Sequence, residues 1–290
     1  MNFRRLELPP GLTFVGVPIG TARDITLRAL DVLASADLLA AEDTRSLRKL
    51  MDIHGIPLDG RRIIALHDHS GASQVARLVE EVKGGASLAY ASEAGMPLIA
   101  DPGFELGRAM REAGLSVTAA PGPSALTTAM AVSGMPTDRF HFAGFLPSTA
   151  NARRKALAAL AGEVATLVFF ESPKRLAAML RDAAETLGAG REAAVCRELT
   201  KKFEEVQRGP LADLIEYYEQ NPPKGEIVVL IDRGAGETVS EMEIEQALGS
   251  ALETMRVKDA SQIVAERFGL ARRDVYQMAL GIMKGKSDAQ

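Results

Sequence analysis

A loop at residues 92–103 combines two carboxylates with glycine and proline and contains no lysine or arginine. It follows a short apolar run at 87–91, which predicts a buried strand, so the loop is expected at the carboxyl end of that strand. Open α/β sheets bind ligands at that end of their strands. Loops that hold phosphates usually have a base nearby or open a helix whose amides face the anion. Glu93 and Asp101 therefore favour a neutral or cationic small ligand.

A second group of polar side chains, Glu42, Asp43, Thr44 and Arg45, follows an apolar run at 38–41. Polar residues at the carboxyl end of a strand lie where open α/β sheets bind ligands. The same residue types are also typical of a helix start, in which Asp43 or Thr44 caps the backbone and Arg45 pairs locally. Both interpretations stay open on the sequence.

Two histidines flank an aspartate at residues 67–69, after an apolar run at 62–66. On an extended chain, His67 and His69 point to the same side. Because Asp68 lies between them and no third ligand is nearby in the sequence, substrate contact is favoured over metal ligation. We predict no metal centre.

The composition is that of a globular protein with more than one core. The chain has 290 residues, of which 47% are hydrophobic and 25% charged, and two to three domains are expected. The single cysteine, Cys196, excludes an internal disulfide framework and a Cys-rich zinc site. Its apolar neighbours predict a buried thiol on a strand. These features favour a reducing, cytoplasmic environment.

Charge and hydropathy restrict the partners of the chain. A net charge of -4 provides no overall basic field, so any nucleic-acid contact depends on local patches. No apolar run approaches the ~18 residues that a membrane span needs. Pro9, Pro10 and Gly11 follow Arg4 and Arg5 where a signal peptide would have its apolar core. We expect no membrane association.

Strands alternate with helices in the first half of the chain, which predicts parallel βαβ units and an α/β fold. The expected strands are 12–17, 38–41, 62–66, 87–91 and 116–119, and the expected helices are 24–36, 73–83, 107–113 and one that ends near 133–134.

The second half is also expected to be α/β. Its expected strands are 166–170, 193–197 and 226–231, and its expected helices are 153–161, 175–187 and 211–218. Each strand again ends in a polar loop, so functional residues of the two halves are expected to face one another. We expect an N-terminal α/β domain at 1–119, a C-terminal α/β domain at 120–233 and a helical tail at 240–286, after a polar linker at 232–239.

The tail carries a helix-turn-helix pattern at 260–276, with Gly269 in the turn. Ser240 and Glu243 form a capping-box signature for an earlier helix. Arg272 and Arg273 fall near the start of the second helix of the motif, where a cation opposes the helix dipole, and this favours contact with phosphates. A small packed bundle with solvated arginines is the alternative.

Nine short motifs follow one another in an order that resembles a single enzyme family. They are VGVPIG at 15–20, AEDTR at 41–45, LHDH at 66–69, SEAGMPLIADPG at 92–103, PGPSA at 121–125, GFLP at 144–147, FESPKR at 170–175, RELTK at 197–201 and KGE at 224–226. Each motif alone is a weak signal. Together they make the chain similar to the ribosomal RNA small subunit methyltransferase I family, within the tetrapyrrole methylase superfamily. The resemblance covers residues 12 to about 233, and a helical tail is expected in the same family.

The resemblance implies methyl transfer from S-adenosylmethionine to the ribose 2'-hydroxyl of a cytidine in the decoding region of 16S rRNA, in the small ribosomal subunit. The positive sulfonium of this cofactor would suit the acidic loop at 92–103. The implied fold has two unequal α/β domains with the cofactor in the cleft between them, and it differs from the Rossmann-like methyltransferase fold. A homodimer is also implied.

Motif by motif, the resemblance implies a set of cofactor-binding residues in five loops. They are Pro18, Ile19 and Gly20 in the first loop, Ala94, Gly95, Met96, Ile99 and Asp101 in the second, Ser124 and Ala125 in the third, and Phe170 or Glu171 with Leu199 or Thr200 from the second domain. The family commonly has Asp and Thr where this sequence has Glu93 and Met96. A side-chain hydrogen bond at position 96 is therefore excluded, and backbone contacts are expected instead.

The implied reaction needs a base as well as alignment. The 2'-hydroxyl oxygen must lie about 3 Å from the methyl carbon, in line with the leaving sulfonium. A carboxylate or imidazole within hydrogen-bond reach could take the hydroxyl proton. Glu42 is the first candidate, because it aligns with a superfamily acid at a strand end that faces the cleft. Asp43, His67 and Glu171 are its rivals.

An RNA substrate would also need basic residues that contact phosphates. The candidates are Arg45, Arg153, Arg154, Lys155, Lys174, Arg175, Lys201 and Lys202, with Arg272 and Arg273 in the tail. A solvated helix face is the alternative for the run at 153–155.

Two other functions compete with rRNA methylation. One is C-methylation of a tetrapyrrole precursor by an enzyme of the same superfamily, against which the helical tail and the basic runs argue. The other is a nucleic-acid-binding regulator whose α/β part senses a metabolite. The weak basicity of the tail argues against a regulator, since residues 256–286 hold seven Lys or Arg against three acids.

Overall fold

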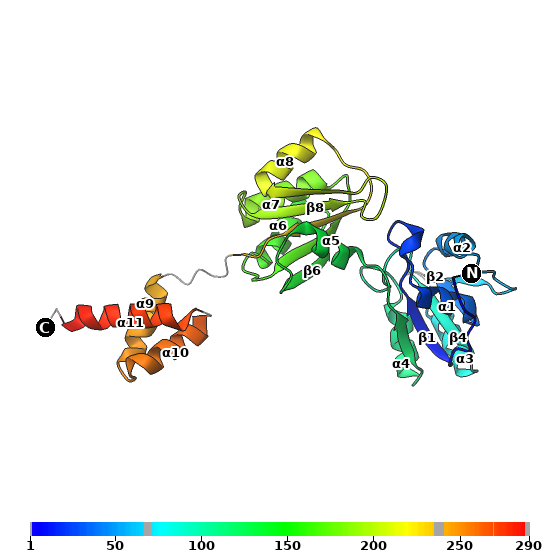
Figure 1. Cartoon of the computed structure of the whole chain (residues 1–290), viewed down its shortest axis with the longest axis horizontal. Helices are drawn as coiled ribbons and strands as arrows, with labels where there is room; N and C mark the ends of the chain where they lie inside the picture. Colours follow the sequence, from blue (N-terminus) through cyan, green and yellow to red (C-terminus); the bar gives the residue numbers. More distant parts are fainter. Residues whose placement is uncertain (1, 67–70, 235–240, 269, 288–290) are drawn as a thin grey trace. The chain divides into compact units, whose positions relative to one another are not determined.

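The computed structural model describes residues 2–66, 71–234, 241–268 and 270–287. It divides into two compact units, Met1–Gly234 and Ala235–Gln290 (Figure 1). His67, His69, Gly269, Ser240 and the linker positions 235–239 lie outside the described residues. The first unit contains two sheets and the second is helical.

The first sheet of the α/β unit is parallel throughout, with the strand order β3-β2-β4-β1-β5. Its strands are β1 (Gly11–Val15), β2 (Leu38–Ala41), β3 (Ile63–Ala65), β4 (Ser87–Ala91) and β5 (Val117–Ala120). The predicted parallel βαβ arrangement of this half is confirmed. In a parallel sheet the loops that follow the strands all lie at one edge, so the polar loops after β1, β2, β4 and β5 meet there.

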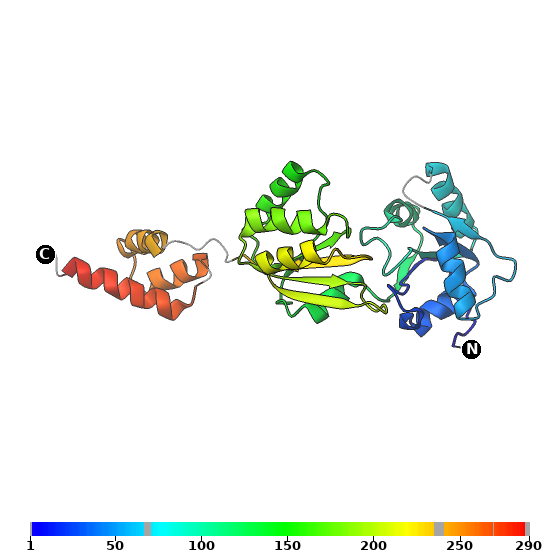
Figure 2. The same ribbon diagram turned by 90° about the horizontal axis from the view of Figure 1, so that it is seen from above.

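Helices cover both faces of this sheet (Figures 1 and 2). Helices α1 (Leu27–Ser35) and α2 (Thr44–Ile53) pack on one face, and α3 (Ala72–Lys83) and α4 (Phe104–Glu112) pack on the other. Successive strand residues point to opposite faces, so Ala89 joins the first core while Leu88 and Tyr90 join the second. A short 3-10 helix, η1 (Ala22–Asp24), precedes α1 and replaces the start of the helix expected at 24–36.

The second sheet is mixed, with the order β6-β7-β10-β8-β9. Its strands are β6 (Phe140–Phe145), β7 (Thr166–Glu171), β8 (Glu192–Arg197), β9 (Glu205–Pro210) and β10 (Ile227–Ile231). Only β6 and β7 pair in parallel, and β10 runs antiparallel to both of its neighbours. Helix α5 (Ala125–Ser133) covers one face, and α6 (Ala150–Ala159), α7 (Leu176–Leu187) and α8 (Leu211–Gln220) cover the other.

Three elements were absent from the sequence-based expectation, and each has a physical reason. Strands β6 and β9 are the two edges of the second sheet, and neither contains a buried residue. Edge strands lack the continuous apolar run of a central strand such as β10, which is buried at every position. Helix α2 places its apolar residues on one face but is polar elsewhere, with Leu47 and Met51 as its buried residues, so it does not stand out from the polar residues around it.

The helical unit has its own small core. Helices α9 (Glu241–Leu252), α10 (Val257–Phe268) and α11 (Arg272–Ser287) pack through Ile244, Leu248, Val264 and Val275. Helix α11 begins at Arg272, as the helix-turn-helix pattern predicts, and Arg272 and Arg273 are exposed.

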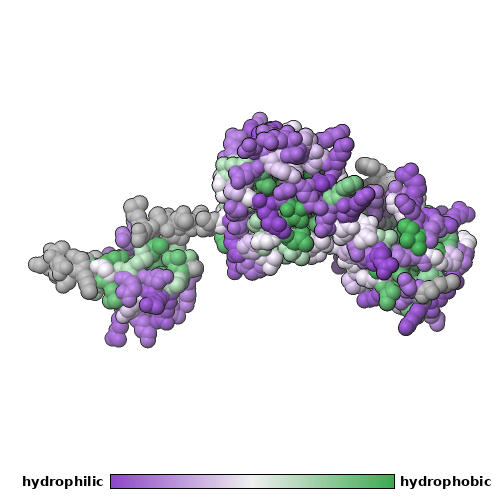
Figure 3. Space-filling model, turned by 45° about the horizontal axis from the view of Figure 1, so that its top comes forward, coloured by the Kyte–Doolittle hydropathy of each residue, from purple (hydrophilic) through white to green (hydrophobic). Residues whose placement is uncertain are grey.

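The visible surface is mostly hydrophilic, and small hydrophobic patches interrupt it (Figure 3). No helix in the described part of the chain has the length and apolar character that a membrane span requires.

Candidate active site

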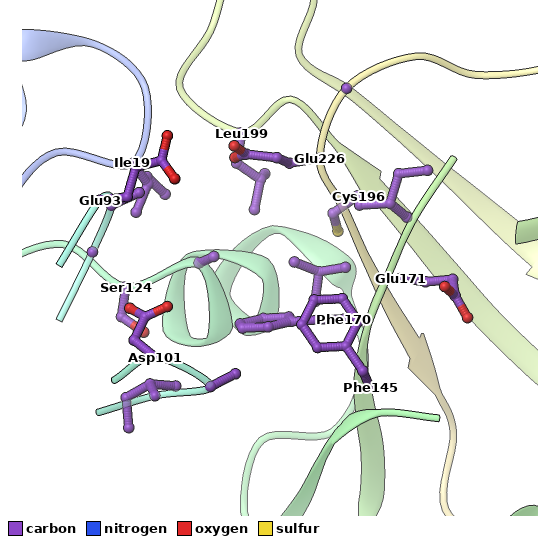
Figure 4. Close-up of a pocket in the computed structure, with 18 of the residues that line it drawn as sticks. Ile19, Glu93, Asp101, Ser124, Phe145, Phe170, Glu171, Cys196, Leu199 and Glu226 are labelled. Atoms are coloured by element: carbon purple, nitrogen blue, oxygen red, sulfur yellow. The ribbon is translucent and has the colours of Figure 1, made fainter. Parts of the chain in front are cut away.

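A cavity of about 450 Å³ is lined by loops from both sheets of the α/β unit (Figure 4). The first sheet and the chain that follows it contribute Ile19, Glu42, Glu93, Ala94, Gly95, Met96, Ile99, Ala100, Asp101, Ser124 and Ala125. The second sheet and its loops contribute Phe145, Phe170, Glu171, Ser172, Pro173, Cys196, Leu199, Gly225, Glu226, Ile227 and Val228. Figure 4 shows Ile19, Glu93, Ser124 and Asp101 on one side and Phe145, Phe170 and Glu171 on the other.

The lining is acidic. Five carboxylates take part, from Glu42, Glu93, Asp101, Glu171 and Glu226, whereas the described residues of the lining include no lysine or arginine. A cavity with one sign of charge and apolar walls concentrates ligands of the opposite sign. The arrangement therefore favours a ligand that carries positive charge.

The wall from the first sheet is held together by backbone contacts. Val17 and Gly95 exchange two hydrogen bonds, with N–O distances of 2.9 and 3.1 Å, so the loops after β1 and β4 are tied to each other. The loops after β1 and β5 cross at Gly16 and Gly122, where a Cβ atom on Gly16 would lie 2.6 Å from the Gly122 nitrogen. Glycine is required there because the two backbones touch.

The wall from the second sheet contains a network of charged side chains, in which Glu198 and Lys201 are partly buried and Glu226 is exposed. Glu198 Oε1 accepts hydrogen bonds from Lys201 Nζ and from the Glu226 amide, each at 3.0 Å, and Lys201 also pairs with Glu226 Oε2 at 3.0 Å. Gly225 has a φ of +95°, and a Cβ atom on it would lie 2.3 Å from Glu198 Oε1. The network thus depends on glycine at position 225, and it joins the loop after β8 to the start of β10.

The loop after β1 and the loop after β8 also meet beside the cavity. The amide of Thr21 donates to Thr200 Oγ1 at 3.2 Å, and a Cβ atom on Gly20 would lie 2.5 Å from the same oxygen. Thr200 therefore links the two loops and does not line the cavity itself.

Backbone strain gathers in the loops around the cavity. Among the described residues, five non-glycine positions have positive φ, and four of them are Leu98, Ala100, Glu198 and Thr200. Such conformations cost on the order of 1–3 kcal/mol each and persist where the surroundings enforce them, often at functional sites. One strained pair lies in each wall.

The adjacent acids Glu42 and Asp43 make different contacts. Glu42 lines the cavity, and its Oε2 accepts a hydrogen bond from the Glu93 amide at 3.1 Å. Asp43 caps α2 by accepting from the Arg45 amide at 2.7 Å, and it forms an ion pair with the Arg45 guanidinium at 3.2 Å. The hydrogen bond from the Arg45 side chain lowers the pKa of Asp43. The helix-cap interpretation is confirmed for Asp43.

Glu171 is a buried acid whose two carboxylate oxygens have different surroundings. The residue is 3% exposed. Its Oε1 accepts from the Ser172 amide at 2.7 Å and lies 3.2 Å from Arg175 Nε, while Oε2 has no hydrogen bond within the described part of the chain. Arg175 also donates to the Leu146 carbonyl at 2.6 Å. Arg175 thus connects the wall to the loop after β6.

Cys196 lies fully buried in the cavity lining. Burial raises the pKa of its thiol to about 12. The thiol is therefore protonated near neutral pH, and the predicted buried strand thiol is confirmed.

The predicted cofactor residues divide into those that line the cavity and those that lie behind it. Ile19, Ala94, Gly95, Met96, Ile99, Asp101, Ser124, Ala125, Phe170 and Leu199 line it. Pro18 and Gly20 line a smaller neighbouring cavity instead.

Sequence reasoning did not select several lining residues of the second sheet. Phe145, Cys196, Glu226, Ile227 and Val228 belong to this group. The motifs at 144–147 and 224–226 contain Phe145 and Glu226, so the signal was present for these two. Ile227 and Val228 carry no polar signal, and only the antiparallel course of β10 brings its first residues to the cavity.

The structure corrects one predicted phosphate contact. Arg153 is 5% exposed, and its guanidinium pairs with the buried carboxylate of Asp182 at 2.6 Å. A buried, paired guanidinium is not available to a phosphate, so Arg153 serves the packing of α6 on α7.

The other predicted bases differ in availability. Arg154 pairs with Asp182 and Glu185, and Arg175 and Lys201 are paired as described above. Lys155 and Lys174 are exposed, and no ion pair is recorded for either within the described residues.

Comparison with known proteins decides the family. A family model for Tetrapyrrole (Corrin/Porphyrin) Methylases matches residues 11–215, and a model for the RsmI C-terminal HTH domain matches residues 238–283. Ribosomal RNA small subunit methyltransferase I of Mesorhizobium japonicum is 42% identical over 94% of this chain and 92% of its own length. The enzyme of the same name from Mycobacterium tuberculosis (strain CDC 1551 / Oshkosh) is 44% identical over 91% of this chain and 92% of its own length. The chain belongs to the ribosomal RNA small subunit methyltransferase I family, within the tetrapyrrole methylases.

A solved structure supports the same fold. The methyltransferase CobJ has a TM-score of 0.59 at 19% identity and covers 78% of this chain and 95% of its own. The resemblance drawn from the nine motifs and the predicted tetrapyrrole-methylase fold with a helix-turn-helix-like tail are confirmed.

Proposed function

We propose that this protein transfers the methyl group of S-adenosylmethionine to the ribose 2'-hydroxyl of a cytidine in the decoding region of 16S rRNA, within the small ribosomal subunit. The names of its relatives support methylation of small-subunit rRNA. The observation that carries the proposal to this chain is the acidic cavity, whose described lining has five carboxylates and no base.

The cavity suits S-adenosylmethionine in size and charge. Sites for ligands of drug size span about 300–1,000 Å³, and the volume of about 450 Å³ falls within this range. The sulfonium and ammonium groups of the cofactor are cations, which the carboxylates complement. We assign the backbone and small side chains of 94–96 and 124–125, with Ile19, Ile99 and Asp101, to one side of the cofactor. Phe170 and Leu199 contact it from the other, and Pro18, Gly20 and Thr200 hold the loops behind.

Within this proposal, Glu42 takes the proton of the ribose hydroxyl. It lines the cavity, and the Glu93 amide holds one of its carboxylate oxygens in place. A positioned carboxylate of this kind contributes typically about 10²–10⁴-fold to a proton transfer. Asp43 is occupied as a helix cap, which leaves Glu171 as the described rival. His67 was also a candidate, and it lies outside the described residues.

RNA phosphates must be bound away from an acidic cavity, because the like charges repel. Exposed bases supply this contact in the proposal: Lys174, which follows the lining residue Pro173, Lys155 on α6, and Arg272 and Arg273 in the helical unit. A plot of the logarithm of RNA affinity against the logarithm of salt concentration has a slope that reports the number of phosphate contacts. Each contact that is removed should reduce the size of this slope by about one.

Tetrapyrrole C-methylation fits the chain less well. The relatives at 42% and 44% identity carry an rRNA methyltransferase name, whereas the tetrapyrrole-family structure CobJ is 19% identical. A metabolite-sensing regulator would have no use for a positioned acid such as Glu42 beside the cavity.

We also propose that the protein forms a homodimer and acts in the cytoplasm, where ribosomes are found. Light scattering of the purified protein tests the dimer.

One labelling experiment tests the function. The protein is incubated with methyl-labelled S-adenosylmethionine and with small ribosomal subunits, naked 16S rRNA or a tetrapyrrole precursor, and the label is mapped. We expect label on the 2'-oxygen of one cytidine. Label on a macrocycle carbon, or no transfer to any of the three, would reject the proposal.

A further inference from the structure

A second cavity, of about 220 Å³, lies on the other side of the loops that form the first wall. Glu93 lines both cavities, and Pro18 and Gly20 line the second where Ile19 lines the first. The smaller cavity therefore adjoins the proposed cofactor site. Its volume falls below the range of about 300–1,000 Å³ typical of drug-sized ligands, so it fits one small ring system and not a second cofactor.

Ser92 lines this cavity, and its hydroxyl is buried. Ser92 is 4% exposed, and its Oγ has no hydrogen-bond partner within the described residues. Buried polar groups are nearly always hydrogen-bonded, so an unpaired one in a cavity wall indicates a group that is supplied from outside the chain. Ser92 follows β4 directly, and the backbone on either side of it is fixed by the strand and by the Val17–Gly95 bridge.

The remaining walls suit a partly apolar ligand. Val17, Pro18, Leu50 and Ile53 supply aliphatic surface, and the carboxylate of Glu93 stands at the boundary with the first cavity. A carboxylate accepts hydrogen bonds from the exocyclic amine of a nucleobase. The apolar walls would contact the two faces of a nucleobase. The hydroxyl and the carboxylate would form hydrogen bonds with its edge.

Helix α2 contributes basic residues beside this cavity. Arg45, Arg48 and Lys49 lie on the exposed side of α2, and Lys49 itself lines the cavity. Arg45 pairs with Asp43 and Arg48 pairs with Asp52, both at the surface, and no ion pair of Lys49 is recorded in the described part of the chain. Exposed ion pairs are weak, so these bases can turn to a phosphate.

We propose that the second cavity receives the base of an RNA nucleotide next to the methylated one, with Ser92 bound to the base and Lys49 to its phosphate. Single-stranded RNA is recognised by splaying out bases and hydrogen-bonding their edges, and this arrangement offers one such subsite. The inference rests on the proposed function, since it requires that the reacting ribose lies beside Glu42, next to the cofactor in the first cavity.

Two variants and a matched control test the subsite. Ser92→Ala removes the hydroxyl, Lys49→Ala removes the base, and Lys83→Ala removes an exposed lysine of α3 that lines none of the cavities described above. For each protein, three quantities are measured: the affinity for S-adenosylmethionine, the affinity for small ribosomal subunits over a range of salt, and the rate of methylation.

For Ser92→Ala we expect subunit affinity to fall by about fivefold to tenfold, the loss of one hydrogen bond, while cofactor affinity stays unchanged. The melting temperature of the free protein should stay the same or rise, because the variant lacks an unpaired buried hydroxyl. For Lys49→Ala the salt slope should fall by about 0.7–0.9, and Lys83→Ala should match the wild type in every measurement.

The outcomes separate this inference from the proposed function. If the wild type methylates rRNA but Ser92→Ala and Lys49→Ala bind subunits like the wild type, the subsite is wrong and the proposed function stands. A cavity that holds only water gives this same result. If the wild type methylates no rRNA, the proposed function fails and the subsite with it.

Discussion

The two sheets of the α/β unit reach the same cavity by different routes. In the parallel first sheet, the loops after β1, β2 and β4, together with the chain after β5, supply the wall. In the mixed second sheet, the ends of β7 and β8 meet the beginning of β10, because Ile227 pairs with Glu171 on one side and with Arg197 on the other.

This difference decides which residues a sequence can reveal. Every strand of a parallel sheet presents its carboxyl end at one edge, so polar residues after strands point directly to the site. In a mixed sheet, an antiparallel strand brings its first residues to that edge, so residues at the start of a strand can also reach the site. Glu226 and Ile227 are at the cavity, whereas the polar residues after β10, Asp232 and Arg233, are absent from its lining.

We expect the largest effect from substitutions of one cavity acid in each sheet, Glu42 and Glu171. Glu42→Gln should lower turnover by about 10²–10⁴-fold and leave cofactor affinity nearly unchanged, because it removes the proposed base. Glu171→Gln should lower turnover by less than about tenfold, because its carboxylate is engaged with Arg175. Single-turnover methylation of small subunits measures both. A larger loss of turnover for Glu171→Gln than for Glu42→Gln would show that the base is Glu171, from the second sheet.

A second comparison concerns the basic run on α6, beside the mixed sheet. Arg153→Met should lower the free energy of unfolding by about 3–5 kcal/mol, because it leaves Asp182 buried with only a partial partner. Lys155→Ala should change stability by less than about 0.5 kcal/mol, since Lys155 is exposed. Urea denaturation measures both. Equal stabilities would mean that the Arg153 pair contributes nothing to the second core.

A third change tests how the mixed sheet holds its wall. Gly225→Ala should cost about 1–3 kcal/mol and weaken cofactor binding, because the added Cβ displaces Glu198 from Lys201 and from the Glu226 amide. Gly190→Ala is the matched control, since nothing lies within 4 Å of a Cβ at that position. Denaturation and cofactor titration measure the two effects. Wild-type cofactor affinity in Gly225→Ala would show that the network does not shape the cavity.

The smallest expected effect is the acid sensitivity of each sheet. Hydrogen bonds from the Ser87 hydroxyl and amide lower the pKa of Asp37, and the Glu226 amide, followed by Lys201, lowers the pKa of Glu198. A lowered folded-state pKa stabilises the fold above the ordinary values of 3.8 and 4.5, and this stability is lost as pH falls through the folded-state pKa.

Asp37→Asn and Glu198→Gln should therefore flatten the fall of the melting temperature below about pH 4.5. Melting curves of both variants and the wild type between about pH 7 and pH 3 measure this. If the melting temperature of a variant falls as steeply at low pH as that of the wild type, the carboxylate of that residue does not contribute to the acid sensitivity of the fold.

Much of the first sheet could be predicted from the sequence, and less of the second. Strands β2 and β4 begin and end where their apolar runs begin and end, because burial on both faces leaves a continuous hydrophobic signal. Strands β6 and β9 left no such signal because they are edge strands. Helix α2 was hidden among polar residues, and its cap was visible only as an alternative interpretation of Asp43.

The sequence by itself determined the family, the alternation of strands and helices, and the acidic loop at 92–103, since these follow from residue types and their order. Only the tertiary structure decided which of these residues share a cavity. It separated Glu42 from Asp43 and buried Arg153 beside Asp182. It also brought the start of β10 to the site and left the hydroxyl of Ser92 without a hydrogen-bond partner among the residues that the structure describes. The reason is physical: charge and hydropathy are properties of a residue, whereas burial, strand direction and unpaired polar groups depend on neighbours that are distant in the chain.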